Sequence, residues 1–252
     1  MNLITPGLLS LILLVFLAGC AHTGADRMNL HQAELRLDLA ERYLIEGEPR
    51  PALEQLQQVQ NVSPDNPRLY FNMGLAHTSM EDWDRAAREF EKALELNPDY
   101  GEAWNNLGQV RQAQGRLQEA RQAYEKALEL EGYMTPEFAY YNLATIFQEK
   151  GETEKALEYA VRSIEKNRRF VPGYELAGSL YHELDLYDEA LRIYGQGAQA
   201  RLDNTGLGLM YAEELVRAGR ISEAKVWFER IIEQNDDSEE AHTARDYLEA
   251  LR

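Results

Sequence analysis

Residues Trp104-Asn105-Asn106-Leu107-Gly108, followed by Ala120 and Tyr124, decide the fold, because the same residue types return along the chain every 34 residues. An alanine recurs at the place of Ala120, and in the first three copies a leucine or an aromatic residue follows it by four places. The recurring alanines are Ala52, Ala86, Ala120, Ala156, Ala190 and Ala224. The spacing lengthens once, by two residues, between Ala120 and Ala156. A period of this length predicts pairs of helices that pack closely and stack on one another.

This pattern resembles the tetratricopeptide repeat, a unit of two antiparallel helices. The residues of the third copy that match the family are Trp104, Leu107, Gly108, Ala120, Tyr124 and Ala127. The resemblance implies an all-α, right-handed solenoid of about six helix-turn-helix repeats. We place the repeats at residues 33–66, 67–100, 101–134, 137–170, 171–204 and 205–238, followed by a capping helix at 239–252. No repeat can bury its apolar face alone, so residues 33–252 are expected to form one body.

Two sets of glycines have separate roles in this pattern. One set lies at the turn between the two helices of a repeat, where a left-handed backbone suits glycine: Gly47, Gly115, Gly151 and Gly219. The other set lies where the two helices should cross closely: Gly74, Gly108 and Gly178. The large residue four places after each alanine is expected to fill the gap towards the next repeat.

The N-terminal residues have the pattern expected of an export signal. Residues 8–18 are apolar except for Ser10, and this run is too short to span a bilayer. It ends in Leu17-Ala18-Gly19-Cys20, which resembles the lipobox of bacterial lipoproteins. The resemblance implies that residues 1–19 are removed, that Cys20 receives diacylglycerol and an N-acyl chain, and that residues 20–32 form a tether. An ordinary secretory signal that ends in cysteine is the alternative, and no Lys or Arg precedes the apolar run.

Lipidation would determine the location of the protein. Cys20 is the only cysteine, so no disulfide competes for its thiol. Two or more acyl chains anchor a protein stably. The next residue is Ala21 rather than the aspartate of an inner-membrane retention signal. The resemblance therefore implies a lipid anchor in the outer membrane, facing the periplasm, and no cofactor besides the lipid.

Charge and composition exclude several functions. The formal net charge is −17, whereas nucleic acids and anionic headgroups are bound by Lys and Arg patches. The five histidines are scattered without metal-ligand spacing, and the sequence has no phosphate-binding loop or nucleophile elbow. We therefore expect no nucleic acid, no metal, no small-molecule substrate and no enzyme activity. The acidic residues either solvate the outer surface or attract a basic partner.

The binding surface is expected on the first helix of each repeat, whose positions 2, 5, 6, 9, 12 and 13 line the groove in tetratricopeptide proteins. In the first repeat, Leu37, Leu44 and Ile45 take such positions and predict an apolar notch. Packing against the segment 28–31 is the alternative explanation for these residues. A clamp for a terminal carboxylate would need several basic groove residues, and only Arg68 and Arg217 qualify.

Amide side chains form the second candidate site. Asn72, Asn106 and Asn142 share position 6 of three successive repeats, and amides at a regular rise can hydrogen-bond an extended peptide. Their neighbours at position 5, which complete the candidate groove, are Phe71, Asn105 and Tyr141. Asparagine can also be frequent here for local reasons, so both interpretations stay open.

The lipobox, short tether and six repeats together resemble the type IV pilus biogenesis lipoproteins, the pilotins of the PilF/PilW type. The joint Glu131–Glu137, which is longer by two residues, and the segments 105–108 and 141–144 are also similar to that family. The resemblance implies a protein partner, the pilus secretin, whose localisation and multimerisation the lipoprotein promotes. Two other roles remain open: an adaptor for a periplasmic peptidase or cell-wall enzyme, and a scaffold of a polysaccharide-export or barrel-assembly complex.

Overall fold

A computed structural model describes residues 29–252, all of whose regular elements are α-helices. The signal sequence, Cys20 and most of the tether lie outside the described residues. Residues 29–45 are helical. They are followed by α2 (Pro49–Gln60), α3 (Pro67–Ser79), α4 (Trp83–Leu96), α5 (Gly101–Ala113), α6 (Leu117–Glu129), α7 (Pro136–Glu149), α8 (Thr153–Lys166), α9 (Val171–Glu183), α10 (Tyr187–Ala200), α11 (Thr205–Arg217), α12 (Ile221–Gln234) and α13 (Glu239–Ala250).

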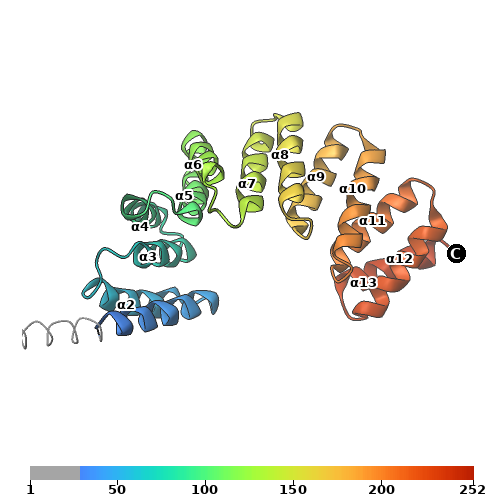
Figure 1. The fold of residues 1–252 in the computed structure, drawn as a ribbon. Helices are drawn as coiled ribbons and strands as arrows, with labels where there is room; N and C mark the ends of the chain where they lie inside the picture. Colours follow the sequence, from blue (N-terminus) through green and yellow to red (C-terminus); the bar gives the residue numbers. More distant parts are fainter. Residues whose placement is uncertain (1–28) are drawn as a thin grey trace, which may run out of the picture. The chain divides into compact units, whose positions relative to one another are not determined.

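The chain divides into two compact units, one ending at Gly115 and the other comprising Arg116–Arg252. We call them the N-terminal and the C-terminal unit. The division falls between α5 and α6, inside the third predicted repeat, where the sequence predicted one continuous body. In the N-terminal unit, α2 packs on α3, α3 on α4 and α4 on α5. In the C-terminal unit, each helix from α6 to α12 packs on the next one, and α13 covers α12 and α11 (Figure 1).

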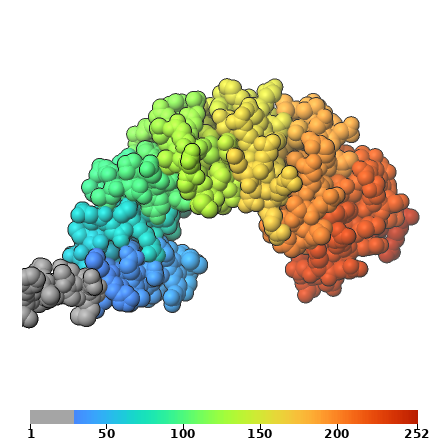
Figure 2. All heavy atoms as spheres, viewed as in Figure 1, coloured from blue at the N-terminus to red at the C-terminus, as the bar shows by residue number. Residues whose placement is uncertain are grey.

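Antiparallel helical hairpins that stack within each unit confirm the predicted all-α tetratricopeptide fold. Side chains of consecutive helices abut along each unit in the space-filling view (Figure 2). Each unit has its own buried cluster: Leu37, Leu56 and Phe90 belong to the first, and Leu180 and Phe228 belong to the second.

The turns inside the repeats confirm the first set of glycines. Gly47, Gly115, Gly151 and Gly219 have φ values of +76°, +74°, +72° and +74°. Glu81 and Asp185 occupy the same turn in the second and fifth repeats, with φ values of 57° and 58°. All six turns therefore use the left-handed backbone, and two of them use it without glycine, at a steric cost.

Close packing explains two glycines of the second set, Gly74 and Gly178. A Cβ at Gly74 would lie 2.6 Å from the Phe90 ring, and one at Gly178 would overlap the Tyr194 ring. Phe90 and Tyr194 are the large residues that follow Ala86 and Ala190 by four places. Their rings therefore lie on the glycine of their own repeat. Phe228, four places after Ala224, has the predicted contact with the following element, because its ring stacks on Tyr247 of α13 at 4.9 Å.

Candidate protein-binding site

The first candidate site is a surface pocket between the helix over residues 29–45 and α3. It has a volume of about 420 Å³, and we call it the N-terminal pocket. Its lining residues come from the first helices of the first two repeats: Glu41, Leu44, Ile45, Phe71, Asn72, Leu75, Thr78 and Ser79. All of them occupy groove positions 5, 6, 9, 12 or 13. The pocket wall is mainly apolar, and its polar residues are Glu41, Asn72, Thr78 and Ser79.

The structure separates the three residues of the predicted apolar notch. Leu44 is half-buried and Ile45 is 86% exposed, and both line the N-terminal pocket. Leu37 is wrong as a groove residue, because it is 0% exposed and belongs to the buried core. At about 100° per residue, Leu37 lies roughly 60° from Glu34 around the helix, on the side that faces the core. Leu44 lies on the same side but in the last turn, where the core ends.

Arg68 holds the polar edge of this region in place. Its guanidinium contacts Glu34 at 3.1 Å, Asp38 at 2.7 Å and Glu41 at 2.6 Å, all from the preceding repeat. These hydrogen bonds lower the pKa of Glu41 and raise the pKa of Arg68. We call these four residues the Arg68 cluster. The Arg68 guanidinium is therefore engaged by three carboxylates of the preceding repeat.

The asparagines do not form the predicted row of free amides. Asn72 is 1% exposed, and its amide donates to Glu41 Oε1 at 3.0 Å. The Asn106 amide donates to the Glu102 carbonyl of its own helix at 2.8 Å, and Asn105 is buried. The predicted row is therefore interrupted at Asn72, whose buried amide has its partner inside the protein.

The position 5 neighbours act mainly in packing. Phe71 lines the N-terminal pocket, and its ring centroid lies 4.8 Å from that of Tyr100. In the C-terminal unit, Tyr141 packs edge-on against Phe170 at 5.7 Å. Burial raises the pKa of Tyr100 to about 12 and that of Tyr141 above its usual value. Asn142 is half-buried beside Tyr141.

Sequence reasoning missed the Arg68 cluster, although a signal was present. Glu34 and Arg68 are 34 residues apart, so they occupy the same position in neighbouring repeats. Glu34, Asp38 and Glu41 follow one another at helical spacing on one face. Charges of opposite sign at one repeat position predict a contact between the first helices of neighbouring repeats.

Arg217, the other predicted basic groove residue, is also engaged. Its guanidinium lies 3.5 Å from Glu214, and Glu214 lies 3.0 Å from the His182 ring. Glu214 is 5% exposed, so these partners compensate a buried carboxylate.

Within residues 29–252, no group of three His, Cys, Asp or Glu side chains could hold a metal ion. None of the helices described in this range is both long enough and apolar enough to cross a bilayer.

Comparison with known families identifies the repeats. Family models described as tetratricopeptide repeat match residues 71–134, 139–168 and 182–246. Together with the stacked hairpins, these matches show that the chain is built from tetratricopeptide repeats, a fold that binds other proteins.

Solved structures with the same architecture include two pilus proteins. PilF of Pseudomonas aeruginosa superposes with a TM-score of 0.69 at 19% identity, over 86% of this chain and 98% of that one. PilW, described as a widely conserved type IV pilus biogenesis factor, superposes with a TM-score of 0.66 at 20% identity, over 84% and 97%. At these identities the likeness shows the fold.

Two curated relatives match over short segments. A UDP-N-acetylglucosamine–peptide N-acetylglucosaminyltransferase of Giardia intestinalis is 38% identical over 71 residues, which are 27% of this chain. The human protein O-mannosyl-transferase TMTC2 is 33% identical over 96 residues, which are 37% of this chain. These matches span 5% and 12% of the relatives' lengths, too little to carry a transferase activity over to this chain.

Proposed function

We propose that this chain is an outer-membrane lipoprotein of the pilotin kind, which binds the type IV pilus secretin and promotes its localisation and multimerisation. The observation that carries this proposal is the correspondence with PilF and PilW over nearly their whole lengths. The lipobox ending at Cys20 and the lengthened joint Glu131–Glu137 support it from the sequence.

The N-terminal pocket is the proposed point of contact with the secretin. Ile45 is 86% exposed beside Leu44 and Phe71, so a partner that covers it removes apolar surface from water. Burying one such side chain contributes about 1.5–3 kcal/mol. The Arg68 cluster keeps Glu41 in place at the edge of the pocket. A mainly apolar pocket with fixed polar edges fits an apolar side chain on an extended or helical segment of the partner.

In this proposal, the lipid anchor explains how binding promotes secretin assembly. Acyl chains on Cys20 hold the protein at the outer membrane, and no cofactor or catalytic step is needed. A bound secretin segment is then confined near the bilayer, where its effective concentration for insertion and multimerisation rises. A Cys20→Ala variant should therefore bind the secretin segment and yet fail to support secretin multimers at the outer membrane.

The experiment compares secretin multimers that resist detergent in cells that carry wild-type protein, Ile45→Glu or Phe71→Ala. We expect both variants to reduce the multimers, because each changes the pocket wall while leaving most of the core intact. Val226→Glu is the matched control, since Val226 is 55% exposed on α12, outside this pocket. Unchanged multimers in Ile45→Glu cells would show that the pocket is not the contact.

Deletion of the whole gene tests the function independently of the site. Loss of the multimers on deletion, together with normal peptidase processing and polysaccharide export, supports the pilotin role. Normal multimers with a defect in cell-wall processing or export would instead identify the protein as an adaptor or scaffold of those systems.

A further inference from the structure

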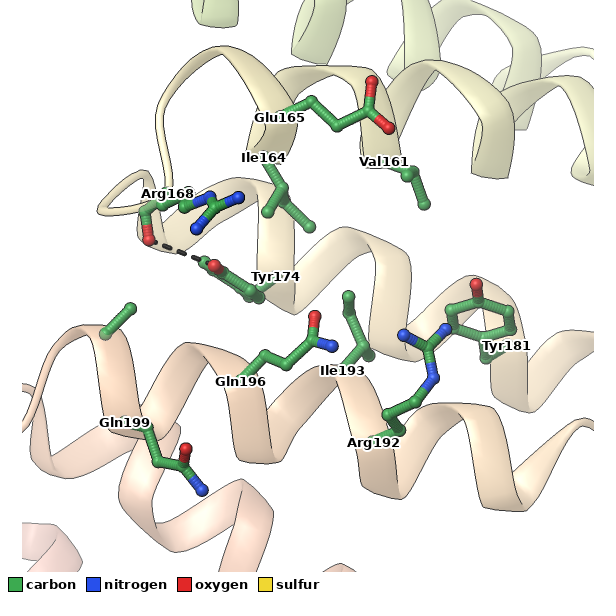
Figure 3. Close-up of a pocket in the computed structure, with 11 residues that line it drawn as sticks. Val161, Ile164, Glu165, Arg168, Tyr174, Tyr181, Arg192, Ile193, Gln196 and Gln199 are labelled. Carbon is green, nitrogen blue, oxygen red and sulfur yellow. Dashed lines mark hydrogen bonds between the residues drawn. The ribbon is translucent and has the colours of Figure 1, made fainter.

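A second pocket lies in the C-terminal unit, on α8, α9 and α10, and we call it the C-terminal pocket. Its volume is about 590 Å³. The residues that define it are Ile164, Arg168, Tyr174, Arg192, Ile193 and Gln196. Figure 3 shows Arg168 and Arg192 towards opposite ends of the pocket, with Ile164, Ile193 and Gln196 between them. The second helices of the fourth and fifth repeats form most of it, so it is a different surface from the first-helix groove.

Neither arginine of this pocket is bonded to an acidic residue of the described chain. Over residues 29–252, neither the Arg168 nor the Arg192 guanidinium has a hydrogen bond or an ion pair. Arg169, the next residue, instead lies 3.9 Å from Asp203, and Arg201 lies 2.9 Å from the same carboxylate. In a chain of net charge −17, a pocket lined by two exposed arginines and one acid, Glu165, has a local excess of positive charge.

Backbone contacts fix the position of Arg168. The Tyr174 hydroxyl donates to the Arg168 carbonyl at 3.0 Å, as the dashed line in Figure 3 shows. Arg201 donates to the Arg169 carbonyl at 3.2 Å. Gly197 allows α10 to approach the Tyr174 ring, because a Cβ there would lie 2.8 Å from Tyr174 Cγ. The loop that presents the Arg168 side chain is thus held from two sides.

We propose that the C-terminal pocket binds an extended segment of a partner protein in which an apolar residue lies between two acidic residues. Arginine binds carboxylates through paired donors, and one guanidinium is available at each end of the pocket. Ile164 and Ile193 are buried and offer an apolar floor between the arginines. Gln196 can donate to and accept from the backbone of the segment. This inference concerns a separate surface and does not depend on the proposed pilotin role.

The spacing of the bound residues follows from strand geometry. Alternate side chains of an extended segment point to the same side. An apolar residue with an acidic residue two places before and two places after therefore directs all three side chains into the pocket. Glu165 is the one acid among the lining residues, and it should weaken binding modestly.

The test measures fluorescence anisotropy of a labelled peptide, Ser-Glu-Ser-Leu-Ser-Glu-Ser, blocked at both ends, with the full chain in detergent micelles. We expect saturable binding that weakens as salt is raised. Arg168→Ala and Arg192→Ala should each weaken it by about fivefold, and Glu165→Gln should strengthen it. Arg169→Ala is the matched control, since it removes the same charge next to the pocket and should leave affinity unchanged. Circular dichroism verifies that each variant is folded.

Several outcomes would overturn the proposal. Equal binding of the peptide with both glutamates replaced by glutamine would show that carboxylates are not recognised. Equal weakening by Arg169→Ala would show an unspecific charge effect. If only peptides with a free C-terminal carboxylate bind, the pocket recognises chain ends. If sedimentation shows that the chain self-associates through this pocket, the pocket binds a second copy of this chain.

Discussion

Arg68 at the N-terminal pocket is surrounded by Glu34, Asp38 and Glu41, whereas Arg168 and Arg192 at the C-terminal pocket have no bonded partner within residues 29–252. Arginine therefore has a different role in each of the two units. At the first pocket it joins two repeats, and the apolar surface beside it is left for binding. At the second pocket the guanidinium groups of the arginines are themselves available to bind a partner. A tetratricopeptide fold thus allows two surfaces of opposite character in one chain.

The largest effect should come from Leu37→Glu, which tests where the N-terminal pocket ends and the core begins. Leu37 is 0% exposed, so the carboxylate would be buried without a partner. We expect a loss of more than about 4 kcal/mol of unfolding free energy, measured by urea denaturation. Leu35→Glu is the control on the same helix, where the side chain is 55% exposed, and it should change stability by less than about 0.5 kcal/mol. Similar stabilities for the two variants would place Leu37 in the groove after all.

Leu37 also shows which features of the structure can be predicted from the sequence and which cannot. Period, small residues and turn glycines predict the repeats well, because each depends on contacts within one hairpin. In the second repeat the groove positions place Phe71, Asn72 and Leu75 on the wall of the pocket. The groove positions give the wrong environment for Leu37. Whether a residue beside the groove is buried or exposed depends on which neighbouring helix packs over it. That is a property of neighbouring helices, and a repeat pattern does not contain it.

The asparagines teach a similar lesson about polar residues. Position 6 correctly places Asn72 beside the pocket, but the pattern cannot tell whether its amide is free. The neighbouring Glu41 decides this, since it accepts the Asn72 amide at 3.0 Å. Arg68 in turn fixes Glu41 through two of its nitrogens, at 2.6 Å each. Hydrogen-bond partners across repeats depend on side-chain rotamers, which sequence spacing does not specify.

The second-largest effect on stability should come from Gly197→Ala, which would disturb the C-terminal pocket without changing its charge. The new Cβ would lie 2.8 Å from Tyr174 Cγ, so the ring that holds the Arg168 carbonyl must move. We expect a net loss of about 1–3 kcal/mol and weaker binding of the acidic peptide.

Gly208→Ala is the control for this change, because its nearest neighbour would be Ile231 at 3.5 Å, an ordinary contact. Removal of a helical glycine there should stabilise by up to about 1 kcal/mol. If Gly197→Ala behaves like Gly208→Ala in thermal unfolding, the close approach of α10 to Tyr174 is not a constraint.

A smaller effect on stability is expected for Arg68→Met, which removes the guanidinium that joins the first two repeats. The Arg68 side chain is 33% exposed and its partners are 37–59% exposed, so solvent screening limits the loss to about 1–2 kcal/mol at neutral pH. The pKa of Glu41 is lowered from 4.5 in the folded protein, so its contribution is present above that value and is lost as pH falls through the folded pKa. The unfolding free energies of wild type and Arg68→Met should therefore converge in acid. A constant difference across pH would assign the loss to packing of the arginine stem.

The smallest effects should come from the two turns that lack glycine, one in each unit. Glu81 and Asp185 have φ values of 57° and 58°, a conformation that disfavours a β-carbon by about 1–2 kcal/mol and suits aspartate better than glutamate. Asp185 also accepts a hydrogen bond from the Tyr187 hydroxyl at 2.8 Å, which glycine would remove. We therefore expect Glu81→Gly to raise the unfolding free energy by up to about 1 kcal/mol, after the entropy that glycine adds to the unfolded chain. Asp185→Gly should leave it within about 0.5 kcal/mol of wild type, because relief of strain and loss of the hydrogen bond oppose each other. Equal gains from both substitutions in urea unfolding would show that the Asp185–Tyr187 bond contributes nothing, and that the two units differ in their pockets but not in the energetics of their turns.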